Sequence, residues 1–297
     1  MNILSLFDGM SCGQIALNKL GIKYDNYFAS EIDKYATQVT KNNYPNTIQL
    51  GDVSKVNGFE LPKIDLMFGG SPCQNFTFAG KRQGMVTKDS IDITSLKQYL
   101  DLKNIGFEFD GQSYLFWEYI RILNEVKPKY FLLENVKMEN KWKNLISSIL
   151  NIEPILINSN LFSAQNRQRL YWTNIPIKEL PTNKETLIDI IEDSVDKKYH
   201  LSSKHHLAFL KSYKWKHNTL NEKSKPLLAS YYKQPPHCPY IICEESESGF
   251  RRLTPLECER LQTVPEQYTK GLSDTQRYRM LGNGWTVDVI SHIFKGI

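Results

Sequence analysis

The first half of the chain alternates short apolar runs with amphipathic segments, and this alternation constrains the fold more than any other feature. Apolar runs that end in polar residues occupy 2–7, 26–33, 47–53, 63–73 and 127–136. After the first run, residues 12–20 have the apolar spacing of a helix, and Gly21 marks its end. Strands that alternate with helices build a doubly wound parallel sheet, so the sequence predicts an α/β fold. Ligands of such sheets bind beside the carboxyl ends of the strands.

The pattern changes further along the chain. Residues 85–112 are weakly periodic, and we expect a flexible loop beside the site. From about Lys178 to Gly249 the chain is basic, aromatic and interrupted by prolines, which predicts a second, smaller domain. Residues 287–294 have helical apolar spacing, and we expect this face to pack on the large domain.

Composition limits the class of protein. The chain has 297 residues, of which 41% are hydrophobic, enough for a large domain and a smaller one. Asp8 and Gly9 interrupt the apolar start, and no apolar run approaches the length of a membrane span. We therefore expect a soluble, cytoplasmic protein with no membrane partner.

The basic residues are unevenly distributed. A net charge of +5 does not by itself indicate nucleic-acid binding. The segment 197–217, however, has six lysines, four histidines, interleaved aromatics and no acid. Such a segment is suited to a phosphate backbone, but a solvated helix face has the same composition, so this segment alone leaves both interpretations open.

Cysteine usage indicates reduced thiols, because the five cysteines are scattered and include no C-x-x-C pair. They are Cys12, Cys73, Cys238, Cys243 and Cys258. Cys238 and Cys243 lie near His237 in the sequence, but their spacing fits no common zinc pattern, and we expect no metal site.

Acidic residues follow the first three predicted strands. Asp8 lies in the turn "FDGMSCG", where Gly9 and Gly13 allow the backbone to approach a ligand closely. Glu31 follows roughly twenty residues later, where nucleotide-binding folds place an acid on ribose hydroxyls. Asp52 ends the third run and is suited to accept a hydrogen bond from an adenine amine. The pattern predicts an adenosine-containing ligand, although simple strand-end caps would look the same.

Two further strand ends carry candidate catalytic residues. Cys73 follows Pro72 and precedes a polar, glycine-rich loop, where a thiol can be both reachable and partly ionised. Glu134 and Asn135 close the next strand, and we expect them beside Cys73 on the same sheet edge. A carboxylic acid there can hydrogen-bond a ring nitrogen; a strand-end cap is the alternative.

Two arginines follow in "QNRQRLYW". Arg167 and Arg169 alternate, so a strand would present both on one face. Paired arginines can hold a carboxylate, a phosphate or a base edge.

These residues belong to six motifs that occur in a characteristic order. The motifs are "LFDGMSCG", "GGSPCQNF", "LLENV", "QNRQR", "RLTPLECERLQ" and "LGNGWTVDVI". In this order they make the chain resemble the cytosine-5 DNA methyltransferases over essentially its whole length.

The resemblance implies a domain organisation, a cofactor and a substrate. It implies a Rossmann-like methyltransferase domain at 1–177 that binds S-adenosylmethionine, and a small target-recognition domain at 178–250. The segment 251–297 would return to complete the large domain. The substrate would be double-stranded DNA, with a cognate restriction endonuclease as a candidate partner and the cytoplasm or nucleoid of a bacterial or phage-infected cell as the location.

The resemblance also assigns roles to individual residues. The catalytic residues it implies are Cys73, Glu134, Asn135, Arg167 and Arg169. Its cofactor-binding residues are Phe7, Asp8, Gly9, Ser11, Gly13, Glu31, Ile32, Asp52, Val53, Pro72, Asn283 and Trp285. Within a catalytic loop at 75–85, Lys81 and Arg82 would contact phosphates and Gln83 would contact bases.

The implied chemistry explains these residue types. Carbon 5 of cytosine is a poor nucleophile, and addition of the Cys73 thiolate at carbon 6 converts the ring to an enamine whose carbon 5 can attack a methyl group. A protonated Glu134 would hydrogen-bond ring nitrogen 3, and the arginines would position the base and the carboxylate. A stacked base cannot react, so the target cytosine must flip out, at a cost of a few kcal/mol.

Departures from the family pattern concern the cofactor contacts and leave the catalytic residues intact. Ser11 stands where F-x-G-x-G has its second glycine, and Gly284 and Trp285 stand where bacterial members commonly have serine and valine; both features are similar to the animal de novo type. Two alternatives remain. One is a tRNA cytosine-5 methyltransferase, although its P-C-Q-P-F-T-R motif and Cys-Phe-Thr tripeptide are absent; the other is an inactive DNA-binding relative.

Overall fold

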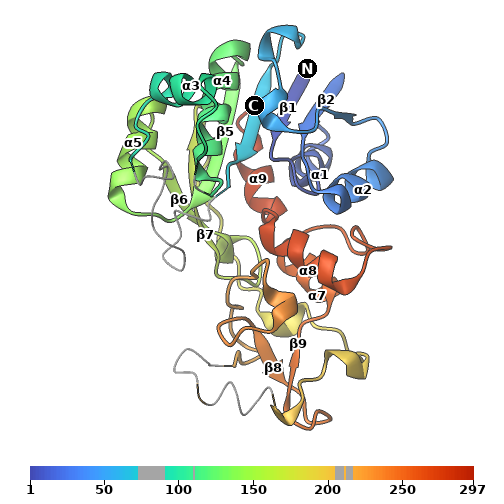
Figure 1. Ribbon diagram of the computed structural model, residues 1–297. Helices are drawn as coiled ribbons and strands as arrows, with labels where there is room; N and C mark the ends of the chain where they lie inside the picture. Colours follow the sequence, from blue (N-terminus) through green and yellow to red (C-terminus); the bar gives the residue numbers. More distant parts are fainter. Residues whose placement is uncertain (73–90, 110, 205–210, 212–216) are drawn as a thin grey trace.

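The computed structural model describes residues 1–72, 91–109, 111–204, 211 and 217–297. A seven-stranded sheet in the order β3-β2-β1-β4-β5-β7-β6 is the centre of the molecule, and β8 and β9 form a separate two-stranded sheet (Figure 1). The strands are β1 Asn2–Leu6, β2 Asn26–Ser30, β3 Ile48–Gln49, β4 Leu66–Gly70, β5 Tyr130–Val136, β6 Ile155–Asn158, β7 Gln168–Thr173, β8 Tyr240–Ile242 and β9 Phe250–Arg252. The helices are α1 Cys12–Lys19, α2 Lys34–Asn43, α3 Leu96–Asn104, α4 Phe116–Val126, α5 Asn140–Leu150, α7 Pro255–Leu261, α8 Asp274–Asn283 and α9 Val287–Phe294.

The predicted α/β fold is confirmed, with one difference in strand direction. β7 is antiparallel to both β5 and β6, whereas the pairs from β3 to β5 are parallel. The connection from β6 to β7, residues 159–167, contains only a short 3₁₀ turn. A connection this short cannot make the crossover that parallel neighbours need, so β7 reverses direction.

Alternation along the strands explains why the sheet is covered on both faces. Ile3 and Phe68 pack in one cluster with α1 and α9, whereas Leu4 and Met67 pack in another with α4 and α5. Successive side chains of a strand point to opposite faces, so apolar residues at consecutive positions supply two cores. This is the burial pattern of an α/β sheet enclosed by helices.

The C-terminal helix packs where the sequence predicted. Figure 1 shows α9 beside α1, although the two helices come from opposite ends of the chain, and they are in contact. Ile290, Ile293 and Phe294 are fully or almost fully buried, and the Phe294 ring contacts that of Phe68 on β4. The apolar face of α9 therefore completes the core on one face of the sheet.

The segment between β4 and α4 contains a helix in its described part, so the expected flexible loop is wrong for these residues. Helix α3 begins after Ser95, whose hydroxyl accepts a hydrogen bond from the Gln98 backbone N–H. It is anchored through Glu118 of α4, a fully buried carboxylate that accepts hydrogen bonds from Tyr99 and Lys103. The helix has nine residues, and an isolated helix of this length is marginal in water, so tertiary contacts stabilise it.

The described residues between β7 and α7 form the lower part of the molecule in Figure 1, which contains β8, β9 and several 3₁₀ turns. Its buried residues, such as Leu227, Tyr231 and Tyr240, belong to the same apolar cluster as α1 and α9. The division into domains at 178 and 251 stays a prediction. In the described part of the chain, no helix is both long enough and apolar enough to cross a membrane.

Replacement of Glu118 tests the anchor of α3. Glu118→Gln removes the charge between Lys103 and Arg121, which both form ion pairs with it. Lys103 then has no ionic partner, while Arg121 keeps its pair with Glu125. Because hydrogen bonds to a buried charge are lost, we expect the free energy of unfolding to fall by about 2 kcal/mol in urea titrations. Glu266→Gln, which breaks an exposed pair with Arg260, is the matched control and should change it by less than about 1 kcal/mol. Equal small effects would contradict the anchor.

Candidate active site

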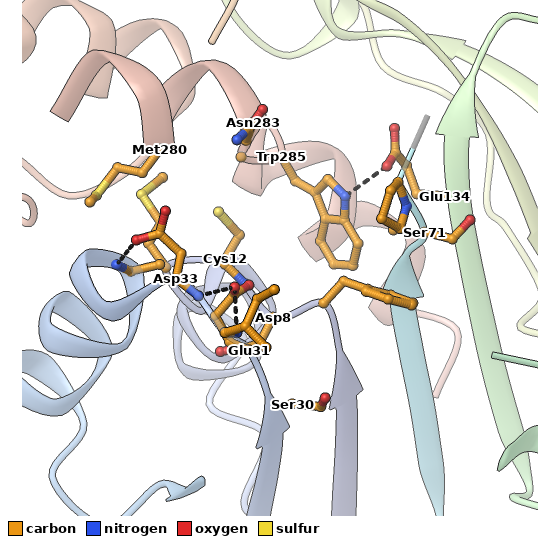
Figure 2. A pocket seen from close by; sticks show the side chains of 18 of the residues that line it. Asp8, Cys12, Ser30, Glu31, Asp33, Ser71, Glu134, Met280, Asn283 and Trp285 are labelled. Carbon is orange, nitrogen blue, oxygen red and sulfur yellow. Dashed lines mark hydrogen bonds between the residues drawn. The ribbon is translucent and has the colours of Figure 1, made fainter. Parts of the chain in front are cut away.

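A cavity of about 380 Å³ lies at the carboxyl ends of β1, β2, β4 and β5, and the returning segment closes one side of it (Figure 2). Most of the described residues that the sequence singled out line this cavity. They are Phe7, Asp8, Gly9, Glu31, Ile32, Asp52, Val53, Pro72, Glu134, Asn135, Arg167, Arg169, Asn283 and Trp285. Cys73, Lys81, Arg82 and Gln83 lie outside the described residues.

The turn after β1 has an unusual backbone. Phe7, Gly9 and Ser11 all have positive φ angles, of 57°, 58° and 64°. Residues other than glycine rarely adopt positive φ angles, because this backbone conformation costs them roughly 1–3 kcal/mol each. Residues with such strained backbones cluster at ligand-binding sites. Ser11 therefore keeps the backbone conformation that suits a glycine, and its hydroxyl donates a hydrogen bond to Asp8.

Ser11 and Gly13 do not line the cavity. Ser11 is fully buried beneath the turn. A Cβ at Gly13 would lie 2.3 Å from the Phe68 ring, so this glycine allows α1 to pack closely on the sheet. Both residues act on the site through the shape of the turn.

Glu31 holds two turns together. Its carboxylate accepts a hydrogen bond from the Gly9 backbone N–H at 2.8 Å and from the backbone N–H groups of Ile32 and Asp33 at 2.8 and 2.7 Å (Figure 2). Fixing one carboxylate with three donors orients it at the cavity wall. Ile32, next in the chain, is 71% exposed although it is apolar, and it lines the same cavity.

Asp52 lies three residues beyond the end of β3, not at its last residue as the sequence indicated. One carboxylate oxygen, Oδ1, accepts hydrogen bonds from the backbone N–H and hydroxyl of Ser54. Among the described residues no donor reaches the other oxygen. Arg121 of α4 donates to the carbonyls of Val53 and Val56, which ties this turn to the helix that packs in the same apolar cluster.

Glu134 at the end of β5 is 8% exposed and is held on both oxygens. Arg169 Nε lies 2.9 Å from Oε1, and Trp285 Nε1 donates to Oε2 at 3.0 Å. The neighbouring Asn135 donates to the hydroxyl of Ser71 at 3.1 Å, which connects the ends of β5 and β4. The predicted juxtaposition of these strand ends is thus present.

Arg167 and Arg169 do not form the predicted pair. Arg169 lies in β7, but Arg167 precedes this strand, and its guanidinium is 2.7–3.1 Å from the backbone carbonyls of Leu227, Gly282 and Gly284. Arg167 is 5% exposed, so these carbonyls are bound away from water. It joins three distant parts of the chain, whereas Arg169 holds the carboxylate of Glu134.

Sequence reasoning missed one wall of the cavity. Gln276, Arg279 and Met280 of α8 line it, as do Gln112 and Leu115 before α4. The spacing of the three α8 residues places them on one helical face, and this periodicity was the available signal. Cys12 also lines the cavity, and burial raises the pKa of its thiol to about 12. Among the described residues, no three histidines, cysteines or acids gather to hold a metal ion.

The family model for C-5 cytosine-specific DNA methylase matches residues 1–97 and 103–297. Type II methyltransferase M1.ScrFI of Lactococcus lactis subsp. cremoris is 30% identical over 98% of this chain and 76% of the relative. The chain belongs to the C-5 cytosine-specific DNA methylases. The resemblance is thereby confirmed, and with it the activity on cytosine in DNA and S-adenosylmethionine as methyl donor.

Two further comparisons place this methylase among its relatives. Orphan methyltransferase M.SPRI of Bacillus phage SPR is 34% identical over 64% of this chain and 40% of its own length. The crystal structure of the Dnmt2 methyltransferase of S. pombe has a TM-score of 0.73 over 99% of this chain and 97% of the other, at 17% identity. At this identity the likeness shows the fold, and it confirms the predicted methyltransferase architecture.

The cavity of the methylase fits its cofactor electrostatically. Asp8, Glu31, Asp33, Asp52 and Glu134 all line it. Carboxylates favour a ligand that carries a sulfonium and an ammonium group. Gly9 adds space, because a Cβ there would meet no atom within 4 Å.

The pKa of Asp8 gives a test of this electrostatic environment. Burial raises the pKa of Asp8 to about 6, and the nearby charge of Glu31 raises it as well. Hydrogen bonds from Ser11 and Tyr27 act in the opposite direction and lower it. A raised acid pKa contributes stability below the unfolded pKa, near 4, and this is lost as pH rises through 6. The difference in the free energy of unfolding between Asp8→Asn and wild type, measured in urea titrations, should therefore shift by about 1 kcal/mol in favour of the variant as the pH rises from 5 to 7.5. A pH-independent difference would contradict this assignment.

Proposed function

We propose that this methylase flips a target cytosine from duplex DNA and methylates carbon 5 through a covalent bond between Cys73 and carbon 6. One observation carries the proposal: the carboxylate of Glu134, fixed by Arg169 and Trp285, lines the cavity together with Pro72. Cys73 is the next residue in the chain after Pro72. A nucleophile and a carboxyl group beside one cavity are what addition to a cytosine ring needs.

The raised pKa values of three other cysteines support Cys73 as nucleophile. Cys12 is the one cysteine of the described chain that lines the cavity, and its pKa of about 12 keeps it a thiol at neutral pH. Burial likewise raises the pKa of Cys238 to about 12, and that of Cys258 well above the ordinary value. Thiolates, not thiols, act as nucleophiles.

The cofactor-binding residues divide into two groups. Glu31 would hold the ribose hydroxyls and Asp52 the adenine amine, through the carboxylate oxygen that Ser54 does not occupy. Phe7, Asp8 and Gly9 would surround the rest of the ligand together with Asn283 and Trp285 of the returning segment. When bound there, S-adenosylmethionine supplies an electrophilic methyl group.

Each catalytic side chain then has one task. The Cys73 sulfur forms a bond to carbon 6, and Glu134 provides a proton to ring nitrogen 3, so that the electron pair of the ring double bond is available at carbon 5. Arg169 orients Glu134, and Asn135 holds Ser71 at the strand end that precedes Cys73. Once carbon 5 carries its methyl group, it loses its proton to water and the carbon–sulfur bond breaks, which restores the thiolate. Ring nitrogen 3 then returns its proton to Glu134, which restores the carboxylic acid.

The proposal extends to DNA contacts and to a biological partner. Lys81, Arg82 and Gln83 of the catalytic loop would contact the duplex, and the basic segment 197–217 would follow its backbone. A type II relative is 30% identical over 98% of this chain, which favours a role beside a cognate restriction endonuclease. An orphan phage relative also matches 99% of the chain, at the lower identity of 24%. The domains 1–177, 178–250 and 251–297 are part of the same proposal.

Methyl transfer with labelled S-adenosylmethionine tests the function. Wild-type protein should label unmethylated duplex DNA and not transfer RNA, and digestion should yield 5-methyldeoxycytidine. Cys73→Ala should abolish transfer while S-adenosylhomocysteine still binds, whereas Cys243→Ala, in the small domain, should keep it. Label in RNA would favour the tRNA enzyme, and no label despite cofactor binding would indicate an inactive relative. Substantial turnover by the Cys73 variant would reject the nucleophile.

Glu134→Gln tests the carboxyl group separately. The amide cannot transfer a proton to the ring, so we expect the single-turnover rate to fall roughly 100-fold or more. The affinity for duplex DNA, measured by fluorescence anisotropy, should change by less than about tenfold, because the amide has nearly the same size. An unchanged rate would remove Glu134 from the mechanism.

A further inference from the structure

Trp285 touches the cofactor cavity and the catalytic carboxyl group with one side chain. It lies between α8 and α9 in the returning segment, and its indole Nε1 donates a hydrogen bond to Glu134 Oε2 at 3.0 Å (Figure 2). The same side chain lines the cavity. These two residues are 151 positions apart in the sequence, so the contact exists only because the C-terminal segment packs back on the sheet.

The indole is held in place by its own contacts. Its ring packs against Phe68 of β4, with ring centroids 6.0 Å apart and an interplanar angle of 58°. Phe68 in turn contacts Phe294 of α9 and Tyr27 of β2. The indole N–H is therefore a donor on a rigid support.

Gly70 leaves the space in which this hydrogen bond forms. A Cβ at Gly70 would lie 2.8 Å from Glu134 Oε2 and 3.1 Å from Trp285 Nε1. Any larger residue would push the two groups out of position. The sequence at the end of β4 thus supports the same contact from the side of the sheet.

The two oxygens of Glu134 have donors from different parts of the chain. Arg169 of β7 binds Oε1, and Trp285 binds Oε2. With only Arg169 present, the carboxyl group could still rotate about its last side-chain bond; a second donor on the other oxygen prevents this. Holding a reacting group in one orientation lowers the barrier of the reaction without adding a chemical step.

We propose that Trp285 is a positioning residue for the methyl-transfer reaction, in addition to its place in the cofactor wall: its indole N–H fixes the carboxyl group of Glu134 toward the target base. This inference rests on the proposed function. It assigns to the returning segment a role in the chemistry as well as in closing the cavity.

Trp285→Phe removes the N–H donor and keeps a flat ring against Phe68. We expect the single-turnover rate at saturating cofactor and duplex DNA to fall roughly tenfold, the effect of losing one hydrogen bond to a charged group. The dissociation constant for S-adenosylhomocysteine, from calorimetry, should change less than about threefold. A merely structural role would not separate the rate from the affinity in this way.

Trp172→Phe is the matched control. Trp172 is a fully buried tryptophan of β7 that does not line the cavity. Like Trp285, it donates one hydrogen bond from its indole N–H at 3.0 Å, in this case to the Ser147 hydroxyl. Its replacement should lower stability but leave the single-turnover rate within about twofold. If Trp285→Phe does not fold, Gly70→Ala replaces it, and we expect the same loss of rate because the added Cβ displaces the carboxyl group.

The outcomes distinguish this inference from the proposed function. A normal rate for Trp285→Phe, with or without weaker cofactor binding, overturns the positioning role while wild-type methylation upholds the function. An equal loss of rate in Trp172→Phe also overturns it, because the effect would then follow stability. Absence of 5-methyldeoxycytidine with wild-type protein overturns the proposed function itself.

Discussion

The site depends on the buried guanidinium of Arg167. It binds the carbonyl of Leu227 and those of Gly282 and Gly284, which lie on either side of Asn283 in the returning segment. A buried carbonyl without a partner costs about 1–3 kcal/mol, so this one side chain makes the arrangement of three distant segments favourable. Gln262 supports the same wall, because its side-chain amide donates to the carbonyls of Leu281 and Gly284.

Close packing around this junction explains several small residues. A Cβ at Gly282 would lie 2.2 Å from the backbone of Leu228, and one at Gly284 would lie 2.9 Å from Met10. Gly282 is required for close approach, because the neighbouring atoms are backbone, whereas at Gly284 the nearest atom is the flexible end of the Met10 side chain. The departure Gly284–Trp285 is thus compatible with the fold: the glycine fits against Met10, and the tryptophan reaches Glu134.

The strand ends and the returning helix were predictable, because both depend on local patterns. Apolar runs that stop at Asp8, Glu31 and Glu134 indicate carboxyl edges of strands, and parallel strands bring these edges together. The helix at 287–294 was predicted from its own periodicity. Its place beside α1 follows from the need to bury that face.

Long-range contacts were not predictable in this way. Nothing local distinguishes Arg167, which binds backbone carbonyls, from Arg169, which binds a carboxylate, although the two are only two residues apart. The hydrogen bond from Trp285 to Glu134 likewise forms only in the folded chain, because the two residues are 151 positions apart in the sequence. Helix α3 was not predicted, because the residue that anchors it, Glu118, lies in another helix. Glutamates are mostly exposed in proteins, so the sequence does not indicate that Glu118 is buried.

The proposed mechanism requires a bond between Cys73 and carbon 6 of a flipped cytosine at this cavity. The most direct measurement is mass spectrometry of the digested adduct formed with S-adenosylmethionine and duplex DNA that carries 5-fluorocytosine at the methylated site. Fluorine on carbon 5 cannot leave as a proton does, so the enzyme should remain bonded to the base. We expect one adduct, on the peptide that contains Cys73. An adduct on another residue, or methylation without any adduct, would show that Cys73 is not the nucleophile.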